Sequence, residues 1–156
     1  MIDLSHIHPM LVHFPIVYFI TATVIFLVLA WKSDNLAAWK CLPLTGGAAL
    51  VLGLCMAYLA AFFGDIALDI AAGKGFAKAP MERHEFMAMV TLTFFSLLAV
   101  LLLVAIWKKI PLTGRRAWFF FAASAVGIVL LLVTAYFGGE LVYRIGVNVD
   151  SVMPVK

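Results

Sequence analysis

Charged residues are scarce in this sequence. They make up only 12% of its 156 residues, while 65% are hydrophobic and the mean hydropathy is +1.11. A soluble domain is about 25% charged and about 45–50% apolar, so this chain has too few charges to cover a water-facing surface. The scarcity excludes a soluble globular domain and a disordered chain. The net charge of +3 comes from basic residues at the ends of apolar runs, not on one exposed face, which excludes a nucleic-acid-binding protein.

Cysteines are few, and common catalytic motifs are missing. Cys41 and Cys55 form no CxxC pair, so we expect neither thiol redox chemistry nor a disulfide framework. No CxxCH is present, which excludes covalent c-type haem. The HExxH motif of metalloproteases and the GxSxG motif of serine hydrolases are also absent, so neither class of enzyme is indicated. No low-complexity tract, repeat or second domain is visible, and we expect a single domain over residues 1–156.

Long apolar runs are what the sequence has instead. There are four, over residues 10–31, 43–64, 84–107 and 118–138. Each is close to the ~20 residues that an α-helix needs to cross a bilayer. Only helices satisfy every backbone hydrogen bond in lipid without closing a barrel. Since the connections are short, the sequence predicts an all-α integral membrane protein, an up-down-up-down four-helix bundle.

Charges and tryptophans predict how this bundle is oriented. The connections on one side carry one acid, Asp34, and six basic residues, which are Lys32, Lys40, Lys108, Lys109, Arg115 and Arg116. The same side holds all four tryptophans, which are Trp31, Trp39, Trp107 and Trp118. Basic residues favour the cytoplasmic side, and tryptophans favour the interface with lipid headgroups. We therefore expect a multi-pass protein of a bacterial inner membrane, in contact with membrane lipid, with both termini in the periplasm.

All four histidines lie toward the other side of the predicted bundle. His6, His8 and His13 precede or open the first run, and His84 opens the third. The first and third helices run parallel, so His13 and His84 are expected at similar depth. Ionisable residues inside a membrane are costly and usually functional, and two facing imidazoles can bind a haem iron from both sides. We predict His13 and His84 as axial metal ligands of a non-covalent haem b, with His8 as a neighbouring partner or alternate ligand; otherwise the histidines anchor at the headgroups.

Other unusual residues gather on the histidine side. Arg83 and Arg144 are expected near haem propionates, because guanidinium groups pair with carboxylates in a bidentate way, although headgroup contact is the simpler role for each. Gly138 and Gly139 either admit a flat ligand between helices or end the last helix. Tyr143, with the nearby Glu140, is a candidate for proton handling or for binding a quinone headgroup.

The two ends of the chain resemble a known family. Residues 8–16, HPMLVHFPI, are similar to the HPxxVHFPI opening of the bacterial membrane family called domain of unknown function 2231. Residues 138–147, GGELVYRIGV, are similar to that family's GGxLVYxxGV ending, and His84 matches the histidine that opens its third helix. The chain departs from the family at Asn148 and at residues 135–137. The family's domains occur fused to Rieske or cytochrome c domains, so the resemblance implies a redox role on the outer face of the membrane.

These expectations combine into one functional hypothesis with two alternatives. The first is a small b-type cytochrome or cytochrome-like subunit, rather than a stand-alone enzyme, that passes electrons between a membrane quinone and a periplasmic or membrane redox partner. It would work in a larger complex or as a homo-oligomer. One alternative is a structural or assembly subunit. The other is a non-haem copper or zinc site built from His8, His13 and His84.

Overall fold

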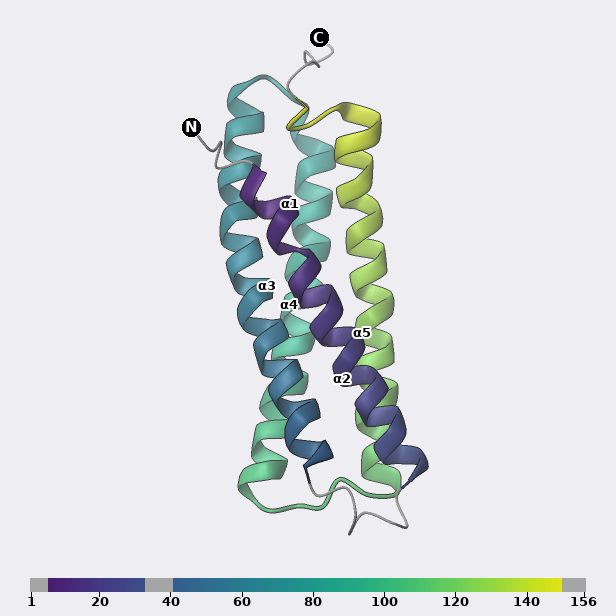
Figure 1. Cartoon of the computed structure of the whole chain (residues 1–156). Helices are drawn as coiled ribbons and strands as arrows, with labels where there is room; N and C mark the ends of the chain where they lie inside the picture. The colour runs from purple at the N-terminus through teal and green to yellow at the C-terminus, as the bar shows by residue number, and fades with distance from the viewer. Residues whose placement is uncertain (1–5, 33–40, 150–156) are drawn as a thin grey trace.

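The structure is a bundle of four long helices, as the sequence predicts. The computed structural model describes residues 6–32 and 41–149. Its elements are α1 (Ile7–Leu11), α2 (His13–Trp31), α3 (Leu42–Gly73), α4 (Lys78–Trp107), α5 (Arg115–Glu140) and the π-helix η3 (Leu141–Ile145) (Figure 1). Four helices, counting α1 and α2 as one, are long and apolar enough to cross a membrane.

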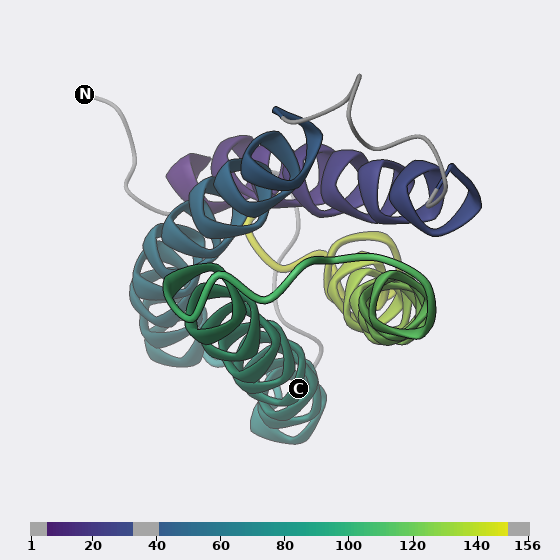
Figure 2. The same ribbon diagram turned by 90° about the horizontal axis from the view of Figure 1, so that it is seen from below.

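The helices form a closed ring in up-down-up-down order. α2 and α4 each pack against both α3 and α5 (Figures 1 and 2). α2 and α4 run in one direction, and α3 and α5 run in the other, so the first and last described residues meet at one end of the bundle (Figure 1). We call this end the terminal end. The opposite end carries Trp31, Trp107 and Trp118, all exposed, and we call it the tryptophan end; Trp39 lies outside the described residues.

The second and third helices extend further than predicted. α3 ends at Gly73 rather than at Gly64, and α4 begins at Lys78 rather than at His84. With 32 residues, α3 is ~48 Å long, whereas the hydrocarbon layer is only ~30 Å thick. Its carboxylates Asp65 and Asp69 are exposed, which a helix tolerates once it leaves the lipid. The α3–α4 hairpin therefore projects beyond the other helices at the terminal end.

The first predicted helix starts earlier than expected and is interrupted. α1 begins at Ile7 instead of Met10, and the helix is broken at Val12 before α2 starts. Pro15 explains the break, because it has no N–H to donate to the carbonyl of Leu11 and its ring crowds that carbonyl. As a result α1 packs on α3, while α2 continues between α3 and α5.

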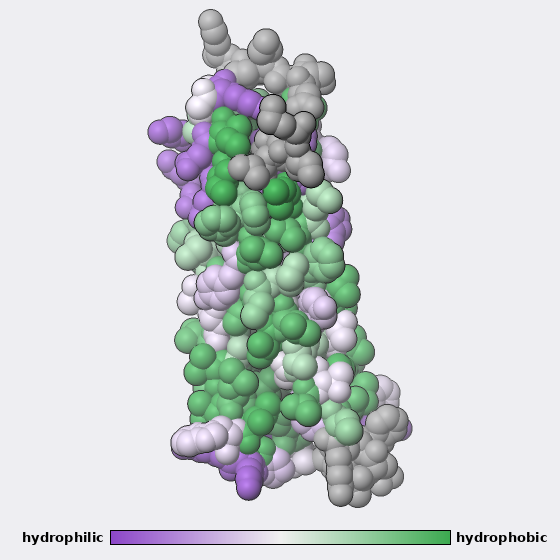
Figure 3. Space-filling model, turned by 60° about the vertical axis from the view of Figure 1, so that its left-hand side comes forward, coloured by the Kyte–Doolittle hydropathy of each residue, from purple (hydrophilic) through white to green (hydrophobic). Residues whose placement is uncertain are grey.

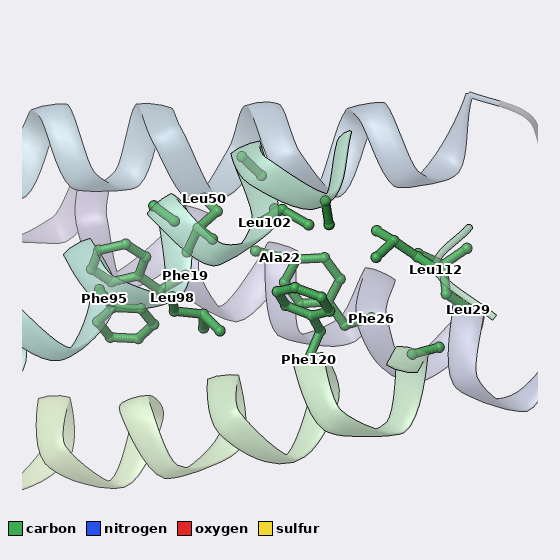
Figure 4. Close-up of a cluster of buried hydrophobic side chains, with 14 of the residues drawn as sticks. Phe19, Ala22, Phe26, Leu29, Leu50, Phe95, Leu98, Leu102, Leu112 and Phe120 are labelled. Atoms are coloured by element: carbon green, nitrogen blue, oxygen red, sulfur yellow. The ribbon is translucent and has the colours of Figure 1, made fainter. Parts of the chain in front are cut away.

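Stacked phenylalanines form the middle of the core. The rings of Phe19 and Phe95 are parallel to within 7°, with centroids 3.8 Å apart, and both are completely buried (Figure 4). Glycines make room for them: a Cβ on Gly53 would lie 2.9 Å from the Phe19 ring, and one on Gly127 would lie 2.6 Å from the Phe95 ring. This contact fixes how closely the four helices approach one another.

A second, smaller cluster closes the terminal end. It is formed by residues of the α3–α4 hairpin and of η3 with the turn after it, which are Ala71, Phe76, Met81, Leu141 and Val147. Between the two clusters lies the part of the bundle that holds the histidines.

The outer surface matches a membrane environment. Hydrophobic side chains cover the middle of the bundle, and hydrophilic ones gather at its two ends (Figure 3). Large apolar side chains such as Leu97, Val129 and Leu132 are left exposed on the outside of the helices. A soluble protein rarely exposes so continuous an apolar surface, so we conclude that the chain is a membrane protein with four candidate spans.

The ring-on-glycine contact predicts the effect of Gly127→Ala. The new Cβ would overlap Phe95 and force the stacked rings apart. Overpacking of this kind costs about 1–3 kcal/mol, which outweighs the gain in helix propensity of up to about 1 kcal/mol. We expect a lower midpoint of thermal unfolding in detergent micelles. Gly73→Ala is the control, because no atom of residues 6–32 and 41–149 lies within 4 Å of its added Cβ. Equal midpoints for the two variants would contradict this account of the core.

Candidate functional site

Two histidines face each other near the terminal end, and they are His8 and His84. Their ring centroids are 6.3 Å apart and the ring planes are 80° from parallel. The expected partner of His84 was His13, but His13 is exposed at the start of α2 and does not line the site. The reason is the helix start: because α1 begins at Ile7, His8 already sits on the helix and points inward. Five residues rotate a helix position by ~140°, so His13 is turned away.

Each imidazole is held by a backbone carbonyl of the next helix. Nδ1 of His8 donates to the oxygen of Ala60 on α3 over 2.7 Å, and Nδ1 of His84 donates to the oxygen of Thr134 on α5 over 3.2 Å. A carbonyl oxygen can only accept, so Nδ1 carries the hydrogen in both rings. In a neutral imidazole this leaves the lone pair on Nε2. Neither Nε2 has a hydrogen-bond partner within residues 6–32 and 41–149, so both nitrogens are free to bind a ligand.

A glycine four residues after each of these carbonyls leaves space for the imidazole to reach the carbonyl oxygen. A Cβ on Gly64 would lie 3.0 Å from Nδ1 of His8, and one on Gly138 would lie 3.0 Å from Cε1 of His84. In an α-helix the carbonyl of residue i points toward residue i+4, so a side chain at i+4 would cover it. Gly138 thus lies inside α5 as a seat for an imidazole and does not end the helix. Gly139 has only the Tyr143 ring near its Cβ position, at 3.9 Å.

The two histidines line a cavity of about 490 Å³ between the main core and the terminal cluster. This volume is within the ~300–1,000 Å³ of small-molecule and cofactor sites. The walls are mostly small or apolar, and include Ile16, Phe19, Ala57, Ala61, Ala88, Leu92 and Leu131. The exposed lining residues lie on α1, where Pro9 is one, and on α5 and η3, where Ala135 and Val142 are two. The opening therefore lies between α1 and the terminal end of α5.

Three polar residues of the cavity escaped the sequence interpretation. The hydroxyls of Thr91 and Thr134 are 2.8 Å apart, so one donates to the other, and the carbonyl oxygen of Met87 lies within hydrogen-bond distance of both. Asn148 contributes Oδ1, which is buried and has no hydrogen-bond partner in the described part of the chain. Thr91 follows His84 by two helical turns, so a polar residue on the same helix face was the available signal for it. No comparable pattern marks Asn148.

The expected haem partners Arg83 and Arg144 do not line the cavity. The guanidinium of Arg83 lies over the Phe137 ring, 5.8 Å from its centroid. Arg144 forms an ion pair with Glu140, four residues earlier, at 2.6 Å, and its side chain is 77% exposed. Arg83 thus lies against a ring of the neighbouring helix α5, and Arg144 is paired with a carboxylate one helical turn before it.

Tyr143 borders the opening of the cavity. Its side chain is 91% exposed, so it contacts the cavity only from the outside. His6 also borders the cavity and is exposed at the N-cap of α1. These two residues belong to the rim, not to the enclosed part of the site.

The described residues contain no group of three His, Cys, Asp or Glu side chains placed to hold a metal ion. The trio of His8, His13 and His84 is thus not brought together. Zinc sites use three or four protein ligands. Two facing imidazoles instead suit a metal whose remaining positions are filled by the cofactor itself, as a porphyrin does.

Comparison with known proteins places the chain in one family. No curated protein and no solved structure matches it. The profile of the family described as "Predicted membrane protein (DUF2231)" matches residues 5–151, a range that includes both histidines, both glycine seats and the whole cavity lining. This confirms the resemblance that the two end motifs predicted. The chain therefore belongs to the DUF2231 family of predicted membrane proteins.

Proposed function

We propose that the protein is a small membrane b-type cytochrome, or a cytochrome-like electron-transfer subunit, in which His8 and His84 hold a haem b. The observation that supports this most directly is the facing pair of imidazoles, each with Nδ1 bound to a carbonyl and Nε2 free. Metal-ligating histidines almost always donate their other ring N–H in this way, because the hydrogen bond fixes the tautomer and orients the ring.

The spacing of the rings supports a single metal atom between them. A metal–nitrogen bond of about 2 Å, plus about 1 Å from nitrogen to ring centre, puts two imidazoles on one metal about 6 Å apart. The centroids of His8 and His84 are 6.3 Å apart. A quinol hydrogen-bonded to both nitrogens would need a gap wider by its own ring and by two hydrogen bonds of about 2.8 Å. The pair is thus too close to clasp a quinone headgroup.

The residues of the cavity fit a flat, mostly apolar group. Alanines and glycines such as Ala57, Ala61 and Gly138 leave the space, and Phe19 closes it toward the core. The described lining contains no Lys or Arg, so acidic groups of a cofactor would be placed at the opening, where Pro9 and Tyr143 are exposed. The expected role of Arg83 and Arg144 toward propionates is therefore not part of this proposal.

The chain's own contribution is to hold two imidazole nitrogen donors in a mostly apolar cavity. A bound haem b would supply reversible one-electron transfer. The opening beside α1 leaves one edge of the site near the surface, which suits exchange of electrons with a quinone in the membrane or with a periplasmic or membrane-bound redox protein. The protein would act as a subunit of a larger redox complex or as a homo-oligomer.

Haem content and three histidine variants test this function. Protein purified from cells with ample haem should show a Soret band, and His8→Ala and His84→Ala should each lower bound haem at least 10-fold. His13→Ala is the matched control, since it also removes an imidazole near the start of the first span but outside the cavity, and it should keep its haem.

Two results would overturn the assignment. One is wild-type protein with no chromophore, including protein that holds stoichiometric copper or zinc by elemental analysis. The other is loss of haem in His13→Ala while His8→Ala retains it, which would restore the pairing expected from the sequence alone. An assembly role without a cofactor would leave all four proteins colourless.

The charge distribution supports an orientation with the terminal end in the periplasm. Lys108, Lys109, Arg115 and Arg116 follow or precede helices at the tryptophan end, which the positive-inside rule assigns to the cytoplasm of a bacterial inner membrane. Alkaline phosphatase fused after Lys156 should then be active, and the same reporter inserted between Lys109 and Gly114 should be inactive. The reverse pattern would place the haem site at the cytoplasmic face.

A further inference from the structure

The two halves of the chain repeat the same arrangement of rings and glycines. The ring residues and the glycines on which they pack recur along the sequence at a nearly constant offset. His84 and Phe95 follow His8 and Phe19 by 76 positions, and Gly127 and Gly138 follow Gly53 and Gly64 by 74. The offset differs because the phenylalanine and the first glycine are 34 positions apart in the first half and 32 positions apart in the second. Trp107-Lys108 also follows Trp31-Lys32 by 76 positions, and both pairs end their helices.

The spacing within each half puts these residues on one helix face. Histidine and phenylalanine are 11 residues apart in both halves, and so are the two glycines. Eleven residues are about three turns of an α-helix, so both members of each pair face the same way. In each half the first helix presents two rings, and the second helix presents two glycines on which those rings lie.

The hydrogen bonds repeat as well. His8 donates to Ala60, four residues before Gly64, and His84 donates to Thr134, four residues before Gly138. Ala60 and Thr134 are again 74 positions apart. The cavity lining follows the same register, as shown by the pairs Ile16 and Leu92, Ala57 and Leu131, and Ala61 and Ala135.

Each ring contacts its own equivalent across the bundle. His8 faces His84, and Phe19 stacks on Phe95. Contact between equivalent residues is the mark of a two-fold relation. α2 runs parallel to α4, and α3 runs parallel to α5 (Figures 1 and 2). An axis that relates the two halves therefore runs along the bundle, and the contacts between equivalent rings put it between the members of each ring pair.

The sequence alone showed no repeat. The correspondence is hard to see there because few residues are identical between the halves, and because the first-half helix is interrupted at Val12, near Pro15, whereas α4 is continuous at the equivalent residue, Thr91. Only the contacts show that the scattered matches share one structural role.

We infer that the chain is a duplicated two-helix unit in which Gly64 and Gly138 are equivalent positioning residues, each holding one imidazole against a ligand on the pseudo-two-fold axis. The identity of the ligand rests on the function proposed above. Such a site suits a ligand that accepts a nitrogen donor on each of two opposite faces, as a metalloporphyrin does. A ligand recognised at one end only would not use two equivalent halves.

Matched glycine variants test this inference in the full-length, haem-loaded protein. Gly64→Ala should displace only His8, and Gly138→Ala should displace only His84. Gly73→Ala is the control, because its added Cβ contacts no other side chain in the described part of the chain. Residues that orient a metal ligand typically contribute 10–100-fold to affinity. We expect each variant to lower haem affinity about 10-fold or more, to equal the other within about two-fold, and to turn part of the haem high-spin in absorption and paramagnetic resonance spectra. Added imidazole should restore the low-spin spectrum.

A pair of ligand-deletion variants covers the case in which an alanine disturbs folding. His8→Gly and His84→Gly remove the imidazole ring but keep the glycine and the carbonyl against which it packs. Diffusible imidazole should therefore rescue haem binding to the same extent in both variants. Unequal rescue, or unequal effects of the two Gly→Ala changes in well-folded protein, would overturn the equivalence while leaving the haem assignment in place.

Histidine nitrogen resonances separate this inference from the proposed function. In haem-free protein in micelles, His8 and His84 should both show the Nδ1–H form, and each Gly→Ala change should shift the resonances of its own histidine only. If wild-type protein binds no haem but shows this pattern, the haem proposal fails and the positioning role stands. If either variant leaves its own histidine unchanged, the positioning role fails.

Discussion

Close packing of a flat ring on a glycine is the contact on which this bundle and its site depend. Helices in lipid gain little from burying apolar surface, because the lipid is equally apolar, so their association relies on tight packing at small residues. Gly53 and Gly64 lie on one face of α3 and let two rings approach its backbone. At one depth the ring is phenylalanine, and the result is an inert core. Three turns away the ring is imidazole, and the same packing exposes a carbonyl that binds Nδ1 of a histidine that lines the cavity.

Besides this packing, the site depends on hydrogen bonds to its imidazoles and on an apolar cluster at the terminal end of the bundle. An imidazole in a membrane span is costly unless it is hydrogen-bonded, and here the partner is a helix carbonyl whose second lone pair would otherwise be unused. The extension of α3 to Gly73 and the turn after η3 build a small apolar cluster on the far side of the histidines. Water is thus kept from the site on the core side by Phe19 and on the terminal side by Leu141 and Val147.

The sequence is sufficient to predict the spans, their order and the end at which the histidines gather, because hydrophobic length and loop length decide these features. It is not sufficient to choose between His8 and His13. That choice depends on where the helix begins. A start at Ile7 rather than Met10 brings His8 onto the helix, where it lines the cavity, and His13 is then ~140° away around the helix axis. The predicted partner Arg144 fails for a different reason. It has a carboxylate four residues away at Glu140, and a local ion pair on a helix surface forms more readily than a contact across the bundle.

The differences between the two halves explain why a symmetric pair of histidines lies in a cavity with one opening. Pro15 breaks the first helix and lets α1 lean on α3, away from the end of α5. α4 is continuous at the equivalent residue, Thr91, which pairs with Thr134, so the second half contributes two hydroxyls to the cavity wall. The duplicated unit supplies the two facing nitrogens, and the divergence of single residues supplies a polar wall on one side and access on the other. In the proposed cytochrome, such a site would hold the haem from both sides and exchange electrons through the edge that faces the opening.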